Sequence, residues 1–561
     1  MDLVEALHIF LLLCSLQVGV WTCPDGCKCK DPRIHCTGLT DLPRALPSTI
    51  TTLHMSNCSI NSLSADDLRN VSNSLLQLLI KDSVLREIQT GTFDSIVNMR
   101  DMGFVETGLT DLPDSLFNHQ NSLRYLTLEG NKLTVLRPAW FSSLTNVKFL
   151  DLSQNLFTSV PEKTFHPLSS LEYLKLSGNN ISYLSKKTFE GLTSLTVLRL
   201  SKNSLQELPP GSLHDLENLE ELSLNDNQIT QLHPDLFSKT SKLNKLSLSH
   251  NRITSLPQGI FLNLPLLSHI SLYQNQLESL SPGTFGPMTL KELWLYDNNL
   301  SRLEEDTFRN LTQLKLLVLS RNQISHVSPG AFRGLEQLGE VSLHTNRLTS
   351  LQPGTFQDLS NLVNISLEHN FLHSLPPGVL QGLSHLGEID LRNNSFQNLP
   401  RKSLESLTIA DKVRLDQNNW KCDMGILPLR DWMNQHPSKV NQSLMVCHLP
   451  DSLNGEPISQ LTSENLIPIF SSTEEPELTT AERRQTPSPG VKTTTTSEHV
   501  GVTSSGSGEH GEGSNSTLTT LIVAAVMSTA VISAVITGCL CWQKKRRGSR
   551  DIEQRNKNYV L

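Results

Sequence analysis

A fixed interval of 24 residues is the feature that most constrains how this chain of 561 residues folds. An asparagine recurs at that interval with a single step of 23, and Cys, Ser or Thr holds the equivalent place in three earlier units. The positions are Cys58, Ser83, Thr107, Asn131, Asn155, Asn179, Asn203, Asn227, Asn251, Asn275, Asn298, Asn322, Asn346, Asn370, Asn394 and Asn418. These sixteen units let the chain exceed the size of an ordinary domain, because a repeat architecture grows linearly.

The pattern around each of these positions reads LxxLxLxxNxLxxL, often with a Pro after it. Side chains alternate along a short extended LxL segment, so the leucines point inward and the residues between them point outward. The Asn side chain both donates and accepts hydrogen bonds, and it therefore satisfies backbone groups that the turn leaves unpaired inside the coil. Period and motif together are those of the leucine-rich repeat.

The predicted fold is a leucine-rich repeat solenoid, with a curved parallel β-sheet on the concave face and irregular or short 3-10 segments on the convex side. One unit cannot bury its apolar side alone, and stacked neighbours supply the missing half. A phenylalanine keeps step with the repeat, and we expect it to pack the outer, convex wall. The phenylalanines are Phe93, Phe117, Phe141, Phe165, Phe189, Phe237, Phe261 and Phe285.

Both ends of such a stack expose apolar core and need caps. The N-terminal stretch "CPDGCKCKDPRIHC" holds Cys23, Cys27, Cys29 and Cys36. A zinc site is the alternative, but C-x3-C-x-C-x6-C lacks the usual paired ligands, and a secreted chain favours disulfides. The resemblance to known leucine-rich repeat N-terminal caps implies the pairs Cys23–Cys29 and Cys27–Cys36.

The C-terminal cap begins "NNWKCDMGILPLRDWM". Caps of this family usually read W-x-C-x-C and carry two disulfides, but here Met424 stands at the second cysteine position. Only Cys447 follows in the cap, so we expect one disulfide, Cys422–Cys447. Trp420 and Trp432 are interpreted as buried core of the cap.

Two apolar segments indicate a type I single-pass protein of the plasma membrane, with its N-terminus extracellular. Residues 1–22 resemble a secretory signal peptide, although the opening "MDLVEALH" is acidic rather than basic. Residues 521–542 run 22 residues without a charge, and about 20 are needed to cross a bilayer. The "KKRR" that follows places the tail in the cytoplasm by the positive-inside rule. The predicted organisation is a signal peptide (1–22), an N-terminal cysteine cap (23–52), leucine-rich repeats (53–418), a C-terminal cap (419–468), a Ser/Thr-rich stalk (469–520), a transmembrane helix (521–542) and a cytoplasmic tail (543–561).

Glycosylation is predicted on the stalk and the repeats. The stalk is rich in Ser, Thr, Gly and Pro, so it buries too little apolar area to fold and suits O-glycosylation. Asn364 lies between Leu362 and Ile365 on a predicted strand, where a glycan would obstruct part of the concave face. Asn57 is doubtful as an acceptor, because Cys58 fills a repeat position. The predicted N-glycosylation sites are Asn70, Asn180, Asn299, Asn310, Asn364, Asn393, Asn441 and Asn515.

Within the predicted span, Ala530, Ala534 and Gly538 form a small-xxx-small row that could pack two helices closely in lateral self- or hetero-association. The alternative is that small residues are simply common in spans. Cys539 and Cys541, at the cytoplasmic edge, are candidate palmitoylation sites, with inert thiols as the alternative.

Charge and motifs argue against nucleic-acid binding and catalysis. The net charge is −8, and the last eighteen residues carry seven Lys or Arg against two acidic residues, which leaves −13 for the rest. Such a body is a poor candidate for phosphate-backbone binding. No H-E-x-x-H, G-x-S-x-G, P-loop or catalytic-cysteine signature occurs. Four histidines recur at outward strand positions without a metal-ligand spacing: His250, His269, His344 and His369. They are interpreted as solvated. We therefore expect no enzymatic activity, no cofactor and no metal site.

The stretch "LKELWLYDNNLSRL" places aromatic residues where the repeat points outward. Trp294 lies between Leu293 and Leu295, and Tyr296 follows on the same side. His269 and Tyr273 are interpreted as matching positions one repeat earlier, which predicts one aromatic patch on the concave wall. Exposed Trp and Tyr clusters are enriched at contact hot spots, and the alternative is that these rings stack to stiffen the curve. The predicted ligand-binding residues are His269, Tyr273, Glu292, Trp294, Tyr296 and Asp297, and further acidic neighbours that suit a basic partner are Glu221, Asp226, Glu340, Glu368, Glu388 and Asp390.

The stretches "GPMTLKELWLYDNNLSRLEEDTF", "LKLLVLSRNQISHVSPGAF" and "WKCDMGILPLRDW" resemble a cell-surface leucine-rich repeat family related to platelet glycoprotein V and the regulatory subunit of carboxypeptidase N. The resemblance implies cell–matrix adhesion and migration, with collagen, fibronectin and laminin as expected partners. The alternative it implies is a regulatory subunit held laterally by another membrane protein. An innate pattern receptor is disfavoured, because the short tail holds no signalling domain.

Overall fold

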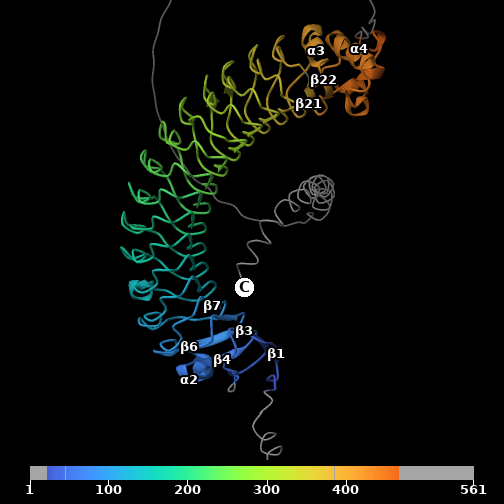
Figure 1. The fold of residues 1–561 in the computed structure, drawn as a ribbon. Coiled ribbons are helices and arrows are strands. Elements are labelled where there is room, and N and C mark those ends of the chain that lie inside the picture. The colour runs from blue at the N-terminus through green and yellow to red at the C-terminus, as the bar shows by residue number, and fades with distance from the viewer. Residues whose placement is uncertain (1–21, 44–45, 385, 467–561) are drawn as a thin grey trace, which may run out of the picture. The chain divides into compact units, whose positions relative to one another are not determined.

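A computed structural model describes residues 22–43, 46–384 and 386–466, which wind into a curved solenoid (Figure 1). An 18-stranded sheet runs through these residues. Its first two strands, β1 (Cys27–Lys30) and β2 (Arg33–Thr37), pair antiparallel, and the later neighbours pair parallel. The strands lie along the inner side of the arc, so the predicted concave sheet is confirmed.

Each of the sixteen predicted units supplies one strand of this sheet. These strands are β3 (Thr52–Ser56), β5 (Gln77–Lys81), β7 (Asp101–Val105), β8 (Tyr125–Thr127), β9 (Phe149–Asp151), β10 (Tyr173–Lys175), β11 (Val197–Arg199), β12 (Glu221–Ser223), β13 (Lys245–Ser247), β14 (His269–Ser271), β15 (Glu292–Trp294), β17 (Leu316–Val318), β19 (Glu340–Ser342), β20 (Asn364–Ser366), β21 (Leu386–Asp390) and β22 (Ala410–Arg414). Two short pairs stand apart from the main sheet: β4 (Ser59–Leu63) with β6 (Val84–Ile88), and β16 (Arg302–Leu303) with β18 (His326–Val327).

Helical segments are short, as predicted for the convex side, and the C-terminal cap also contains helices. The α-helices among the described residues are α2 (Ala65–Leu68), α3 (Arg401–Leu407) and α4 (Leu427–Gln435). The 3-10 turns are η1 (Arg69–Val71), η2 (Pro138–Phe141), η3 (Met424–Ile426), η4 (Gln442–Leu444), η5 (Asp451–Leu453), η6 (Ile458–Gln460) and η7 (Glu464–Leu466).

The recurring asparagines form a continuous hydrogen-bonded ladder inside the coil. The Asn251 amide nitrogen donates to Leu248 O at 3.0 Å and to Leu224 O at 2.9 Å, one unit earlier. Its oxygen accepts from the backbone N–H of Ile229 at 3.0 Å. Asn227 also donates to Leu224 O, so successive asparagines share one carbonyl acceptor. The predicted role of Asn in satisfying buried backbone groups is confirmed.

The earlier units meet the same need with other residues, as predicted. Ser83 accepts from the backbone N–H of Cys58 at 3.0 Å and donates to Lys81 O at 2.7 Å. Thr107 donates to the Asn131 oxygen at 2.7 Å and joins the ladder there. Cys58 is buried and carries a free thiol.

The phenylalanine column is a stack of buried rings. Phe237, Phe261 and Phe285 stack with centroids 6.0 and 5.7 Å apart. The stack continues past the predicted residues through Phe308 to Phe356. Such pairs add to the apolar burial that holds successive units together.

Both caps carry the expected disulfides. Cys23 pairs with Cys29 and Cys27 with Cys36 at one end, and Cys422 pairs with Cys447 at the other. Trp420 and Trp432 are buried in the C-terminal cap, as predicted. The buried apolar core extends from Ile34 to Leu466. A fragment of residues 23–470 therefore contains both closed ends and the whole described core.

Several predictions fall outside the described residues. These are the signal peptide apart from its last residue, the stalk, the membrane span at 521–542 with its small-residue row, Cys539, Cys541, Asn515 and the tail. Among the residues that are described, no helix has both the length and the apolarity that crossing a bilayer requires.

Candidate ligand-binding face

The concave sheet displays Trp294 and Tyr296 as the alternation predicts. On β15, Leu293 and the following Leu295 are fully buried, whereas Trp294 and Tyr296 are only partly buried. The indole is thus outside the leucine core. Its Nε1 donates to the Glu292 carboxylate at 3.3 Å, which holds the ring against the surface of the sheet.

Four rings form one continuous group, here called the Trp294 cluster and defined as His250, Tyr273, Trp294 and Tyr296. Tyr273 and Tyr296 stack with centroids 4.6 Å apart and planes at 7°. Trp294 meets Tyr296 edge-on at 6.3 Å, and His250 meets Tyr273 edge-on at 5.4 Å. Burial raises the pKa of Tyr296, so its phenol is neutral and available as a hydrogen-bond donor at neutral pH.

The prediction that His269 matches Trp294 is wrong. The strand register pairs His269 with Glu292 and Ser271 with Trp294. His269 is exposed and its Nδ1 lies 2.7 Å from the Ser268 hydroxyl. The fourth ring of the cluster is His250, which sits in the turn before Asn251 with φ of 55°, rather than on a strand. His369 occupies the equivalent turn position with φ of 57°, so two of the four histidines predicted to lie on strands lie in turns.

Most of the acidic neighbours are not free to attract a basic partner. Asp297 pairs with Arg321 at 2.6 Å and Glu221 with Arg199 at 2.9 Å. The remaining close pairs are Asp226–His250, Asp390–Arg392 and Glu388–Arg414. Arg199, Arg321, Arg392 and Arg414 therefore partly cancel the acidic character predicted for this face.

The fold does not require aromatic residues at these places. Ser223, Ser247, Ser271, Ser342 and Ser366 occupy the strand position that Trp294 holds in its own repeat. The position of Tyr273 and Tyr296, two residues before the ladder Asn, is Ser in the units on either side, Ser249 and Ser320. The strands therefore keep the same register with a small polar residue at these positions. This weakens the alternative interpretation that the aromatic rings stack to stiffen the curve.

A second row of aromatic residues lies on the same face and was not predicted. Tyr125, Phe149 and Tyr173 are register partners on β8, β9 and β10. Their centroids are 6.1 and 6.2 Å apart, and Tyr173 is 40% exposed. The signal that could have found them is three aromatic residues at one motif position in consecutive repeats.

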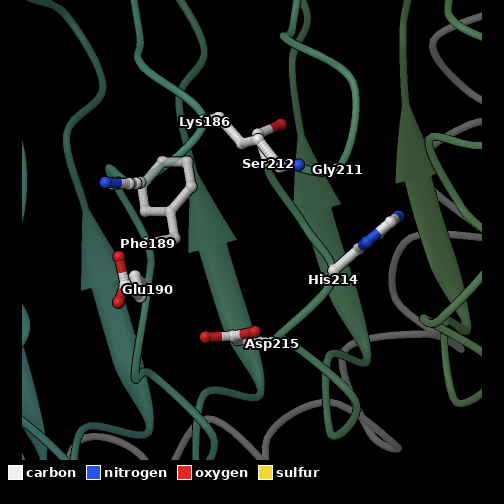
Figure 2. A pocket seen from close by; sticks show the side chains of 8 residues that line it. Lys186, Phe189, Glu190, Gly211, Ser212, His214 and Asp215 are labelled. Atoms are coloured by element: carbon white, nitrogen blue, oxygen red, sulfur yellow. The ribbon is translucent and has the colours of Figure 1, made fainter.

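Two hollows near the repeats lack the geometry of a catalytic site. Figure 2 shows the first, of about 450 Å³, between the return loops of successive units. Ser212, His214 and Asp215 line it, but His214 Nε2 lies 3.4 Å from the Ser238 hydroxyl and Asp215 accepts from the backbone N–H of Gly191 at 2.9 Å. Ser212, His214 and Asp215 are therefore not hydrogen-bonded to one another as a catalytic triad would be.

The second hollow, of about 650 Å³, is an open groove beside the turns of three repeats. His344, Glu368 and His369 line it together with Arg321. Burial lowers the pKa of His344, which favours the neutral ring. Within the described part of the chain no cluster of three or more His, Cys, Asp or Glu could hold a metal ion.

The predicted glycosylation sites differ in how free their side-chain amides are. Asn364 lies on β20 and is exposed, as predicted. The amide nitrogen of Asn310 donates to Phe285 O at 2.9 Å, and that of Asn393 donates to the Gln417 oxygen at 2.6 Å. Those two amides hold adjacent repeats together. Exposed acceptors are Asn70, Asn180, Asn299 and Asn441.

A family model described as Leucine rich repeat matches seven overlapping segments that together span residues 105–419, more than half of the chain. The segments are 105–157, 148–205, 193–253, 241–290, 288–343, 336–396 and 361–419. A comparison with curated protein sequences gives no match. Proteins of this fold typically serve as interaction scaffolds without enzymatic activity.

Solved structures with the same fold come from distant organisms. A leucine-rich repeat protein of Leptospira interrogans is 26% identical with a TM-score of 0.54, covering 67% of this chain and 92% of its own. Toll in the Toll–Spatzle complex of Drosophila is 20% identical with a TM-score of 0.52, covering 77% and 71%. The ectodomain of the Arabidopsis thaliana membrane receptor kinase GASSHO1/SCHENGEN3, in complex with CASPARIAN STRIP INTEGRITY FACTOR 2, is 23% identical with a TM-score of 0.53, covering 76% and 52%. These likenesses establish the solenoid fold.

Proposed function

Because the chain belongs to the leucine-rich repeat family, we propose that it is a type I cell-surface protein whose ectodomain binds extracellular proteins through its concave face. The Trp294 cluster is the observation that carries this proposal. It presents rigid, half-buried aromatic surface at positions where neighbouring repeats place serine. Large aromatic side chains at partly exposed positions are the residues that dominate binding energy at protein interfaces.

The fold itself supports a protein ligand. Toll and the GASSHO1/SCHENGEN3 ectodomain, which share it, were both solved in complex with partners named in their structures. The two hollows described above lack catalytic geometry, and the largest continuous feature of the described residues is the open sheet. A broad concave sheet suits a protein surface better than a small molecule, which needs a cleft that encloses it.

The finer proposal is that the ligand is an extracellular matrix protein and that binding serves adhesion and migration. It rests on resemblance: the stretches quoted above, including the cap in which Met424 replaces a cysteine, are similar to leucine-rich repeat-containing protein 15. Members of that kind are associated with attachment to collagen, fibronectin and laminin. A chain held at the plasma membrane by residues 521–542, with the repeats outside the cell, has the topology that this role needs.

The repeat offers a way to block chosen parts of the face. The native acceptor Asn364 is the first residue of β20 and begins the sequence Asn-Ile-Ser. His269 and Glu340 are the first residues of β14 and β19 and are also followed by an apolar residue and Ser. His269→Asn and Glu340→Asn therefore create new acceptors at the register position that the chain already fills with Asn.

The test measures binding of residues 23–470 to immobilised collagen, fibronectin and laminin. We expect His269→Asn, which places a glycan beside the Trp294 cluster, to abolish binding, and Trp294→Ala and Tyr296→Ala to weaken it at least tenfold. Glu340→Asn, next to the native site at Asn364, is the matched control and should bind normally. A mass increase confirms that each new glycan is attached. Normal matrix binding by the folded, glycosylated His269→Asn protein would refute the proposed site.

The same fragment separates this proposal from its alternative, a regulatory subunit held laterally by another membrane protein. The row Ala530, Ala534 and Gly538 is the sequence feature that favours lateral packing. A matrix receptor retains its partner without residues 521–542, whereas a lateral subunit loses it. Retention of matrix binding by residues 23–470 supports the first function, and partner capture by the full chain alone supports the second.

A further inference from the structure

We infer that a second binding surface lies over β8, β9 and β10, and that it takes an acidic segment of a partner protein that also carries apolar side chains. The surface is here called the Tyr125 ladder and is defined by Tyr125, Phe149 and Tyr173. Its three residues lie seven, six and five repeats before Tyr296, and the inference goes beyond the proposed function, because it predicts a ligand of different chemistry.

The rings of the ladder are displayed rather than buried. Each is the first residue of its strand, and the leucine that follows it is fully buried. The three rings tilt against one another at 36° and 40°, which leaves their outer surfaces as one shallow apolar strip. Phe149 has no polar group, so its partly exposed ring gains only from apolar contact.

The fold does not need aromatic residues at this position either. The same strand position holds Glu221, Lys245, Glu340 and Asn364 in later repeats, and the backbone there is unchanged in register. Val197 and Leu316 also occupy this position, so the distinguishing property of this surface is three consecutive aromatic rings where other repeats place charged, polar or aliphatic residues. Apolar surface of this kind, bordered by charge, is typical of a contact site for a protein segment.

A row of cations borders one edge of the ladder. Arg100, Arg124 and Lys148 each immediately precede a strand and are exposed. Lys148 pairs with Glu172 at 2.6 Å. Among the described residues, neither Arg100 nor Arg124 lies within ion-pair distance of a carboxylate. Burial raises the pKa of Asp101, and the charges of both guanidinium groups oppose that shift. Each exposed guanidinium group presents the planar fork of donors that binds a carboxylate.

Two further charged residues, Lys175 and Glu129, determine which edge of the ladder suits an acidic group. The Lys175 ammonium lies 4.7 Å from the Phe149 ring centre and 2.9 Å from the Asp151 carboxylate. Glu129 lies on the opposite edge, two residues beyond β8, where it would repel an acidic ligand. The partner's acidic groups therefore belong on the Arg100–Arg124 edge, with its apolar side chains on the rings. The Trp294 cluster differs in that carboxylates lie beside it, namely Glu292, Asp226 and Asp297, of which Asp297 is paired with Arg321.

The test uses the full chain in detergent and a labelled twelve-residue peptide of alternating Glu and Phe. A peptide of alternating Lys and Phe is the charge control. We expect the acidic peptide to bind at least tenfold more tightly than the basic one, and binding to weaken as salt rises. Arg124→Glu should weaken binding at least tenfold. Lys315→Glu, an exposed cation at the same place before β17, is the matched control and should change it less than twofold.

A glycan tests the location independently. Tyr125 begins the sequence Tyr-Leu-Thr, so Tyr125→Asn creates an acceptor on the ladder itself. We expect the glycosylated Tyr125→Asn protein to lose binding of the acidic peptide and to keep binding of the matrix ligand. We expect His269→Asn to lose the matrix ligand and to keep the acidic peptide, so the two proposals can fail independently. Unchanged peptide binding by glycosylated Tyr125→Asn would overturn the inference. So would binding of heparin alone, with Arg124→Glu abolishing it, because that result would identify a sulfated polysaccharide in place of a protein segment.

Discussion

Replacing Asn251 by Ala tests the central physical claim about this solenoid, that each ladder asparagine satisfies buried backbone groups of two units. The Asn251 oxygen is the acceptor for the Ile229 N–H, at 3.0 Å. Besides a longer contact with Ser249 O at 3.2 Å, its nitrogen donates to two carbonyls, Leu224 O and Leu248 O. Each of these carbonyls keeps a second donor, from Asn227 and Asn275 respectively. The substitution thus orphans one N–H and removes one of two bonds from each carbonyl.

The magnitude follows from that count. A buried donor without a partner costs about 1–3 kcal/mol, and each lost second bond costs about 0.5–1.5 kcal/mol. We therefore expect Asn251→Ala to lower the free energy of unfolding by about 2–6 kcal/mol. Asn251→Ser should cost roughly half as much, because Ser83 shows that a hydroxyl at this position accepts a backbone N–H and donates to a nearby carbonyl. Gln276→Ala, an exposed change one position after the next ladder Asn, is the control.

Urea unfolding of residues 23–470, followed by tryptophan fluorescence, gives the change in stability. Hydrogen exchange at the Ile229 amide gives a local measure that holds even if the repeats unfold in stages. We expect that amide to lose protection in Asn251→Ala and to keep it in Gln276→Ala. If Asn251→Ala lowered stability by less than 1 kcal/mol and left Ile229 protected, the shared-carbonyl account of the ladder would be wrong.

Three further predictions concern the caps, pH and glycans. Removing the disulfide with Cys422→Ser and Cys447→Ser should lower the free energy of unfolding by about 3–4 kcal/mol in the chain-entropy account, measured by urea titration, because it closes a loop of sequence separation 25; reducing agent should have no further effect on that cap. Burial, and then the nearby charges of His35, Arg33 and Lys81, lowers the pKa of His54. Its folded pKa lies below its unfolded value, so the stability it contributes is present above about pH 6.5 and is lost as pH falls below that; His54→Leu, which copies its register partner Leu79, should reduce the loss of stability between pH 7 and pH 5. Glycopeptide mass spectrometry should find a glycan on Asn364 in a larger fraction of molecules than on Asn310, whose amide nitrogen is already donated to Phe285 O; equal occupancy would contradict this reasoning.

The inward half of the molecule could be predicted from the sequence because its residues recur. Leucines, ladder asparagines and phenylalanines each have one allowed place in the coil, so the period alone located the strands and the polar ladder. The caps followed from cysteine spacing and family resemblance, and all three disulfides are confirmed. Trp294 and Tyr296 were placed outward correctly, since alternation along a strand needs no tertiary information.

The outward half could not be predicted as well, because its contacts depend on neighbours one repeat away. His250 joins the Trp294 cluster from a turn residue with positive φ, and alternation along a strand says nothing about the direction of such a side chain. The pairing of Asp297 with Arg321 likewise depends on which rotamers two adjacent turns select. The three residues of the Tyr125 ladder occupy one motif position in consecutive repeats. The repeat motif specifies only the inward leucines, so it does not predict that outward aromatic residues form a surface.

The two aromatic surfaces also set a condition on any single partner that uses both. Their middle residues, Phe149 and Tyr273, lie five repeats apart, and neighbouring strands are about 4.8 Å apart, so the separation along the sheet is about 24 Å. An extended chain rises about 3.3 Å per residue, so roughly seven residues of one partner could reach from one surface to the other. In that case a glycan at either surface would weaken binding of the same ligand. Each glycan would reduce the affinity of this ligand by more than it reduces the affinity of a short peptide that reaches only one surface, because binding at one end raises the effective concentration at the other. If instead each glycan affects a different ligand and leaves the other unchanged, the concave face carries two independent sites, as the exposed Arg100 and Arg124 beside one surface and Glu292 beside the other indicate.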